Sequence, residues 1–371
     1  MKRKQDDVAR LYPPRLRGRP GRLEVWYATL TDPRTGTGVW IHHEVVTPPD
    51  GSPGPARAHG WISVFPPGGP PVTERFTAGA EPVGSGQADS EPIDSGQADS
   101  EPIDSGQAGA GRIGAGAAGA AGAAGPKQTG SEQADSGEVY FASADVLASR
   151  TRLAGHAGRI RWRLDVHEAG APLYTFPRWA WERAVLPAAQ IVPAPDAGFD
   201  GFIEVGAERL ELAGATGAVA RIAGHGNARR WAWLHAGLGG GDVLEVVAAV
   251  ARRPGMRLLP PLPLLRLRVG GRDWPADPLL AAPLFKARIG LPEWSVRGRV
   301  GRRRLSIEVR QDPGECVTLG YTDPDGATAT CTNSERASAE VVVERRTGSR
   351  FEIEHRWTLD HTAHAEVGTR P

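Results

Sequence analysis

Cysteine and long apolar runs are scarce in this 371-residue chain, and lysine is rare beside arginine. Two cysteines cannot form the disulfide framework of a small secreted domain or a four-cysteine zinc site. No stretch approaches the roughly 18 apolar residues of a membrane-spanning helix. The basic start, MKRKQDDVARLYPP, lacks the apolar centre of a signal peptide. We therefore expect a cytoplasmic protein without a transmembrane segment.

The chain also lacks an excess of charge of either sign. Lys plus Arg number 44 and Asp plus Glu number 43, so the formal net charge is +1. This balance provides no electrostatic reason to expect nucleic acid or an anionic membrane as the main partner. The 48 glycines and 32 prolines indicate that part of the chain is loop or disorder.

The segments along the chain predict two folded parts and one low-complexity insertion. Residues 1–20 are basic and aperiodic, which predicts a disordered tail. The ten residues SGQADSEPID at 85–94 recur at 95–104, and an Ala/Gly run follows, so we predict a disordered insertion over 78–137. The remaining residues then form a first domain, 21–77 and 138–215, and a second domain, 216–371.

The remaining chain has the pattern of β-strands joined by short turns. Residues 22–31 and 38–46 alternate and are rich in β-branched and aromatic side chains, and DPRTG between them is typical of a hairpin turn. Similar segments recur as far as 350–359. Only 178–190 has room for a short helical turn. This pattern predicts an all-β fold of antiparallel barrels or sandwiches.

Two segments resemble a known family. EVWYATLTDPRTGTGVWI, residues 24–41, is similar to the opening hairpin of the two-barrel, lipocalin-like proteins that include the carotenoid 1,2-hydratases (hydroxyneurosporene synthases), the tocopherol cyclases and the decalin-forming Diels–Alderases. GHGNARRWAWLHAGLGGGDVLEVV, residues 224–247, resembles the junction where their second barrel begins. The resemblance implies two consecutive antiparallel lipocalin-like β-barrels, the first carrying the insertion. It also implies a hydratase, cyclase or isomerase that acts on a lipophilic terpenoid, polyene or polyketide without a cofactor.

The strongest local cluster of candidate site residues is Trp231, Trp233 and His235. A spacing of two residues places all three on one face of a strand. If that face points into a barrel, the two indoles and the imidazole would form an apolar cavity with one polar group, suited to a flat lipophilic ligand. An imidazole there could transfer a proton near neutral pH. A solid aromatic core with a hydrogen-bonded histidine is the alternative.

Other candidates lie on the first hairpin and on the loop before residue 231. If Glu24 lies beside the lumen, its carboxyl group is a candidate general acid with a raised pKa, and an exposed position at the start of the strand is the alternative. Loops at a barrel mouth often carry the polar groups of a site, which makes His225 a candidate catalytic residue and Asn227 a candidate ligand contact; a solvent-facing turn is the alternative. The aromatic residues expected to contact the ligand in the first barrel are Trp26 or Tyr27, whichever points inward, and Trp40.

No metal site is expected, because the adjacent His42 and His43 point to opposite faces of a strand and the spacing indicates no third ligand. Three functions remain open: an enzyme, a non-catalytic carrier of a lipophilic small molecule, or a structural protein with solid cores. A large apolar cavity would argue against solid cores, and a carboxylate or tyrosine hydroxyl at its wall would favour an enzyme. Transient contact with a membrane, to load the ligand, is a further expectation.

Overall fold

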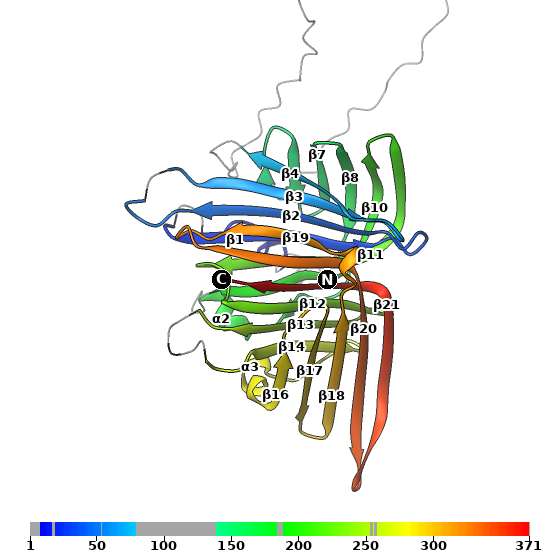
Figure 1. The fold of residues 1–371 in the computed structure, drawn as a ribbon. Helices are drawn as coiled ribbons and strands as arrows, with labels where there is room; N and C mark the ends of the chain where they lie inside the picture. Colours follow the sequence, from blue (N-terminus) through cyan, green and yellow to red (C-terminus); the bar gives the residue numbers. More distant parts are fainter. Residues whose placement is uncertain are drawn as a thin grey trace, which may run out of the picture. The chain divides into compact units, whose positions relative to one another are not determined.

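The computed structural model describes residues 8–16, 19–52, 54–78, 139–183, 188–252, 255 and 258–370, which belong to one compact unit. The described chain folds into two antiparallel sheets (Figure 1), which confirms the predicted all-β fold with two consecutive lipocalin-like halves. Apart from Ala78, the end of a strand, the predicted insertion at 78–137 lies outside the described residues. No helix in these ranges is long and apolar enough to span a membrane.

The first sheet has the strand order β4-β3-β2-β1-β11-β10-β8-β7-β6-β5, with β9 beside β10. Its strands are β1 (Arg22–Thr31), β2 (Gly38–Thr47), β3 (Arg57–Phe65), β4 (Val72–Ala78), β5 (Val139–Ala142), β6 (Val146–Ser149), β7 (Arg152–Ala157), β8 (Ile160–His167), β9 (Leu173–Tyr174), β10 (Ala188–Val205) and β11 (Glu208–Gly224). The last strand, β11, pairs with the first, β1. Shifts of register along β10 and β11 let this long hairpin bend.

The second sheet repeats this arrangement, with the order β15-β14-β13-β12-β21-β20-β18-β17-β16 and β19 beside β20. Its strands are β12 (Arg230–Gly239), β13 (Asp242–Val250), β14 (Leu262–Val269), β15 (Arg272–Trp274), β16 (Phe285–Arg288), β17 (Glu293–Val300), β18 (Arg303–Arg310), β19 (Val317–Thr322), β20 (Thr328–Thr347) and β21 (Arg350–Thr369). Again the last strand, β21, pairs with the first, β12. In both halves the chain therefore closes beside its own starting strand.

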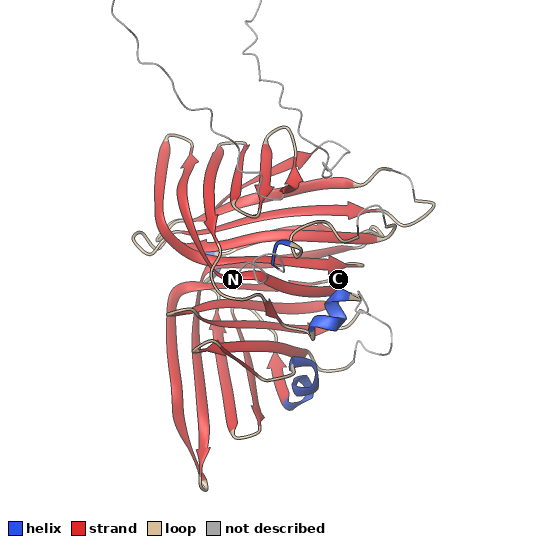
Figure 2. Ribbon diagram, turned by 180° about the vertical axis from the view of Figure 1, so that it is seen from behind, coloured by secondary structure: helices blue, strands red, loops and turns tan. Residues whose placement is uncertain are grey.

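Short helices connect some of the strands (Figure 2). They are α2 (Arg178–Glu182), α3 (Pro278–Ala281), and the 3-10 turns η2 (Ala282–Leu284) and η3 (Pro313–Glu315). The carboxylate of Asp277 caps α3 by accepting hydrogen bonds from the backbone N–H groups of Leu279 and Leu280. The predicted helical turn within 178–190 corresponds to α2, whereas α3 has no counterpart in the prediction.

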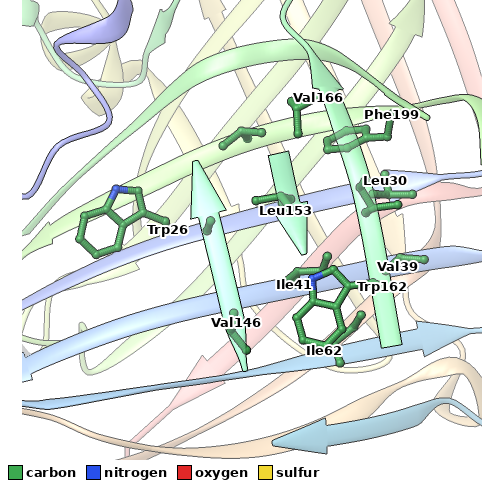
Figure 3. Close-up of a cluster of buried hydrophobic side chains, with 14 of the residues drawn as sticks. Trp26, Leu30, Val39, Ile41, Ile62, Val146, Leu153, Trp162, Val166 and Phe199 are labelled. Atoms are coloured by element: carbon green, nitrogen blue, oxygen red, sulfur yellow. The ribbon is translucent and has the colours of Figure 1, made fainter. Parts of the chain in front are cut away.

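Each sheet surrounds an apolar core of its own, and a third cluster joins the two sheets. Trp26, Leu30 and Phe199 belong to the first core (Figure 3). The second core contains Leu234 and Val246 among many aliphatic side chains. Because side chains alternate along a strand, the opposite faces of the same strands form the third cluster. The candidate functional site lies there, between the sheets.

Two expected boundaries differ from the structure. Within the predicted tail, Val8, Leu11, Tyr12 and Leu16 are buried, because these apolar residues pack against the first sheet and its neighbouring loops. The predicted domain boundary at 215/216 falls inside β11, and the first sheet continues to Gly224. The change from one sheet to the other takes place between Gly224 and Arg230.

Candidate functional site

A cavity of about 1510 Å³ lies between the two sheets. Strands β1, β2, β10 and β11 line it from the first half, and β12, β13, β14, β16, β19 and β21 line it from the second. Most of the lining is apolar or aromatic. The polar side chains of its inner wall are Tyr27, His42, Glu44, Gln190, Tyr321 and Glu366. A cavity of this size and lining can enclose a lipophilic molecule and orient it through a few polar groups.

The tryptophan face of β12 points in the direction opposite to the one expected. Ala232 and Leu234 fill the core of the second sheet, whereas Trp231 and Trp233 face the first sheet across the cavity. The prediction that this face lines the inside of the second barrel is therefore wrong. The physical reason is size, because the small and aliphatic side chains of the alternate face fit the closed core.

Behind the cavity wall, the fully buried Glu245 accepts hydrogen bonds from both halves of the molecule. The Gln190 Nε2 donates to it at 2.7 Å, and the Trp233 indole N–H donates to the same carboxylate oxygen. The Nδ1 of His235 lies 2.8 Å from the other oxygen. Gln190 Nε2 also donates to the Tyr27 hydroxyl at 2.8 Å. This network sets the positions of three side chains that line the cavity.

Glu44 is a buried carboxylate on the first-sheet side of the wall. Its Oε2 lies 3.4 Å from the Nε2 atoms of both His42 and His59. Burial alone would raise the pKa of Glu44, but the hydrogen bonds from the two imidazoles outweigh it and lower the pKa to about 2. Since burial lowers the pKa of His42, that imidazole is neutral and stabilises the carboxylate as a hydrogen-bond donor.

Glu366 is the corresponding carboxyl group on the second-sheet side. The indole N–H of Trp231 donates to its Oε1 at 2.8 Å. Burial raises the pKa of Glu366, and the hydrogen bonds from Trp231 and Cys331 offset this only in part. The two carboxyl groups of the cavity wall therefore have pKa values displaced in opposite directions.

Tyr321 lies near both carboxyl groups. Burial raises the pKa of its hydroxyl well above the usual value, and the nearby side chains of Cys331, Glu366 and Glu44 add to the effect. Its ring packs edge-on against Trp61, with centroids 5.3 Å apart. A neutral hydroxyl thus lies within the electrostatic reach of the two groups.

A second buried pair lies next to the cavity. The Nδ1 of His364 contacts Glu335, and the His364 ring lies 3.9 Å from the ring of Trp233. Burial raises the pKa of Glu335 and lowers the pKa of His364, so both directions favour a neutral pair with an O–H···N hydrogen bond. His364 is buried because β21 carries it between the sheets.

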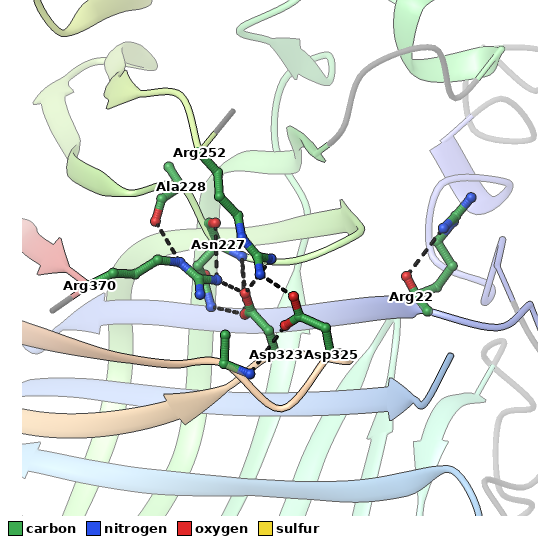
Figure 4. Close-up of polar contacts among 9 residues, drawn as sticks. Arg22, Asn227, Ala228, Arg252, Asp323, Asp325 and Arg370 are labelled. Carbon is green, nitrogen blue, oxygen red and sulfur yellow. Dashed lines mark hydrogen bonds and ion pairs between the residues drawn. The ribbon is translucent and has the colours of Figure 1, made fainter. Parts of the chain in front are cut away.

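The buried carboxylate of Asp323 holds the mouth of the cavity together (Figure 4). It accepts hydrogen bonds from the backbone N–H of Asn227 and from its side-chain Nδ2, the latter at 2.8 Å. The guanidinium groups of Arg370 and Arg252 also contact it. Asn227 lines the cavity from this position.

His225 also lines the cavity mouth, where its Nδ1 contacts the Arg22 guanidinium. Burial, followed by the charge of Arg22, lowers the pKa of this imidazole. Tyr27 and Trp40 likewise belong to the lining, on the first-sheet side. Six of the nine predicted site residues therefore contact one cavity: Tyr27, Trp40, His225, Asn227, Trp231 and Trp233.

The other three predicted site residues lie elsewhere. Glu24 forms a buried ion pair with Arg221 and accepts the backbone N–H groups of Arg15 and Leu16 at 2.7 and 3.0 Å. Trp26 belongs to the core of the first sheet. His235 lies behind the wall, beside Glu245. For Glu24, the structure supports a role in packing the N-terminal segment rather than in chemistry at the cavity.

Sequence reasoning missed Glu44, Gln190, Glu245, Tyr321 and Glu366. One of them had a readable signal, because the turn at 239–242 pairs His235 directly with Glu245 in the β12–β13 hairpin. The others depend on which distant strands meet. Within the ranges described, no group of three or more His, Cys, Asp or Glu side chains has the arrangement of a metal site.

Comparison with known proteins places the chain in a family. A family model described as tocopherol cyclase-like matches residues 132–369. This chain belongs to the tocopherol cyclase-like family. Uncharacterized proteins from two strains of Mycobacterium tuberculosis are each 43% identical to this tocopherol cyclase-like protein over 357 residues, which is 96% of this chain and 89% of theirs.

Solved structures similar to this tocopherol cyclase-like protein include two distant ones. An AttH-like protein from Nitrosomonas europaea is 13% identical, with a TM-score of 0.48 over 93% of this chain and 92% of that one. Kievitone hydratase from Nectria haematococca is 7% identical, with a TM-score of 0.48 over 93% of this chain and 88% of that one.

Proposed function

We propose that this tocopherol cyclase-like protein is an acid–base enzyme that hydrates, cyclises or isomerises a lipophilic terpenoid, polyene or polyketide in the cavity between its sheets. The observation that carries the proposal is the pair Glu366 and Glu44, two carboxyl groups on the wall of one apolar cavity with pKa values displaced in opposite directions. Such a pair assigns the acid and the base of a reaction. Family membership supports the same class of chemistry.

In this mechanism Glu366 is the acid. Its proton passes to one carbon of a substrate double bond, whose π electrons form the new C–H bond and leave a carbocation at the neighbouring carbon. The aromatic faces of Trp231 and Tyr321 line the cavity near Glu366 and can stabilise that charge. The apolar wall keeps bulk water from the cation.

Glu44 is the base. A hydroxyl of the substrate, or a water molecule, adds to the carbocation through its oxygen and loses its proton to the Glu44 carboxylate. The first case closes a ring and the second hydrates the double bond. Direct loss of a neighbouring C–H proton to Glu44 would instead give an isomer. Proton exchange with solvent then restores Glu366 and Glu44, so no other reactant is consumed.

A carrier that holds the same ligand without changing it is the second candidate. The observation in its favour is that both carboxyl groups are already hydrogen-bonded within the protein, Glu366 to the Trp231 indole and Glu44 to two imidazoles. Hydrogen bonds of this kind can serve to satisfy a buried polar wall. Binding and turnover must therefore be measured separately.

The experiment combines tryptophan fluorescence quenching with product analysis for polyenes, prenylated quinols and linear polyketides. We expect saturable quenching and conversion of at least one bound ligand by the wild type. Glu366→Gln should keep the binding and lower the conversion by about 10²–10⁴-fold, the usual contribution of a general acid. The matched control, Glu352→Gln, changes an exposed glutamate on β21 and should convert at the wild-type rate.

Two results would decide against the enzyme. Ligands that quench the wild type without any product would establish the carrier. Conversion that survives in Glu366→Gln would remove the assigned acid. Trp233→Ala, which opens the cavity wall, should weaken the quenching in either case.

A further inference from the structure

Exposed leucines gather in two segments of the second half. Leu258 and Leu259 precede β14, Leu262 begins it, and Leu280 and Leu284 lie on α3 and η2. We call these five residues the mouth patch. They make up half of the ten large hydrophobic residues that are exposed in the described ranges, so the exposure is concentrated. Leu258 is 95% exposed and Leu280 is 78% exposed.

The mouth patch is continuous with the cavity. Leu259 and Leu262 line the cavity themselves, and so do Leu279 and Pro283, the chain neighbours of Leu280 and Leu284. Helix α3 packs on β14, and the two lie side by side in both views (Figures 1 and 2). Contiguous exposed apolar side chains around an opening mark an interaction site.

Positive charge adjoins the mouth patch. Lys286 and Arg288 lie two residues apart on β16, so their side chains share one face of the strand. Both are exposed and both line the cavity. Among the residues that the structure places, no carboxylate lies within ion-pair distance of either. The nearby Asp277 uses its carboxylate to cap α3.

We infer that the mouth patch docks on the surface of an anionic phospholipid bilayer and that the cavity loads its ligand from there. The inference rests on the proposed function, because it takes the ligand to be lipophilic. Leucines inserted between the headgroups and cations facing the phosphates are the two features of interfacial membrane binding. A protein partner would not require the apolar surface to continue into a ligand cavity.

Co-sedimentation with phosphatidylcholine vesicles, with and without phosphatidylserine, tests the docking. The wild type should bind the phosphatidylserine vesicles. The double variant Leu258→Asp/Leu280→Asp should lose about tenfold or more of this binding, because two inserted apolar side chains become charged. Lys286→Glu/Arg288→Glu should lose about tenfold on phosphatidylserine vesicles only. Ile353→Asp, which changes an exposed residue near the tip of the β20–β21 hairpin, is the matched control and should bind as the wild type does.

A second measurement separates this inference from the proposed function. Quenching by a detergent-solubilised polyene, without vesicles, should be equal in the wild type and in Leu258→Asp/Leu280→Asp, because neither of these two leucines lines the cavity. No vesicle binding by the wild type, or equal binding by the leucine variant, overturns the docking while the quenching still stands. A wild-type dimer in analytical ultracentrifugation that the leucine variant abolishes would assign the patch to a second copy and also overturn it. Vesicle binding without quenching would instead count against the proposed ligand.

Discussion

The interior of each sheet and the space between the sheets are built from opposite faces of the same strands. On β1, Trp26 enters a closed apolar core, whereas Tyr27 reaches the cavity. On β12, Leu234 is in a core and Trp233 is at the cavity. The cores hold tightly packed aliphatic and aromatic groups, while the space between the sheets holds carboxyl groups and open volume. Residues that pack the cores and residues that line the cavity therefore alternate along the same strands.

The cavity lowers the stability of the fold, which explains why the closed cores and the cavity are separate. A buried carboxyl group loses hydration, and open volume loses packing contacts. Two closed cores, one for each sheet, can compensate for both. The repeated strand order, with each last strand beside the first, builds such a core twice.

The largest expected effect concerns the pH dependence of turnover between the sheets. Glu366 must be protonated to act as an acid, so conversion should be greatest below its raised pKa and should fall as the pH rises through that value. In Glu366→Gln this fall should disappear, together with about 10²–10⁴-fold of the rate. A pH–rate profile at saturating ligand measures it. An unchanged alkaline limb in the variant would place the acid elsewhere.

Truncation of one aromatic residue from each region should separate stability from binding. Phe199→Ala empties part of the first core and should lower the free energy of unfolding by about 3–5 kcal/mol. Trp231→Ala faces an existing cavity and should cost less stability but reduce ligand quenching strongly. Denaturant unfolding and ligand titration of both variants make the comparison. Equal losses of stability would contradict the division between core and cavity.

His42 and His43 are adjacent on β2, so His42 faces the cavity and His43 faces the core of the first sheet. Burial lowers the pKa of His43 to about 3, against roughly 6.5 for histidine in an unfolded chain. The unfolded state therefore binds the proton more tightly. The contribution of neutral His43 to stability is complete above about pH 6.5 and is lost as the pH falls toward 3.

The substitution His43→Phe tests this dependence, since the ring lies among Phe76 and Phe141. It should reduce the loss of unfolding free energy on acidification from pH 7 to pH 4 by about 2–3 kcal/mol, to the extent that the ring fits. His156→Phe, which changes an exposed histidine, is the control and should leave the slope unchanged. If the wild type and His43→Phe lose equal unfolding free energy between pH 7 and pH 4, other groups determine the acid sensitivity.

The smallest expected effect comes from the hydrogen-bond network of Glu245 behind the cavity wall. Gln190→Ala removes a hydrogen-bond donor to Glu245 and to the Tyr27 hydroxyl. Glu245 still has its hydrogen bonds with Trp233 and His235. We expect a loss of about 1–2 kcal/mol in unfolding free energy and about a tenfold weaker ligand titration. Wild-type values for both measurements would mean that the network does not position the wall.

Much of the fold was predictable because strand alternation and turn residues are local signals. The hairpin of residues 22–31 and 38–46 has nearly the predicted bounds. The strand β10, Ala188–Val205, has no clear alternating pattern in its first half, because Pro193, Pro195 and several small residues weaken it. Its register shifts accommodate these residues.

The site was predictable only in part, because the two faces of a strand can be alike in composition. An alternating strand with large apolar groups on both faces does not indicate which face is inside its own sheet. Trp26 and Tyr27 could not be distinguished for this reason, and the tryptophan face of β12 was assigned to the wrong side. The meeting of Glu44 with His59, or of Glu366 with Trp231, depends on strand pairing that spacing along the chain does not encode.

The strand order has a consequence for biosynthesis. Tyr27 and Glu44 belong to β1 and β2, whereas Tyr321 and Glu366 belong to β19 and β21, which are synthesised after every strand of the first sheet. The first sheet can close on itself as soon as β11 is made, with Trp40 and Trp61 on a face that only the second half covers. Nascent chains halted before β19 should therefore expose an aromatic surface to which chaperones can bind, and the cavity between the sheets should form only after β21 has been synthesised.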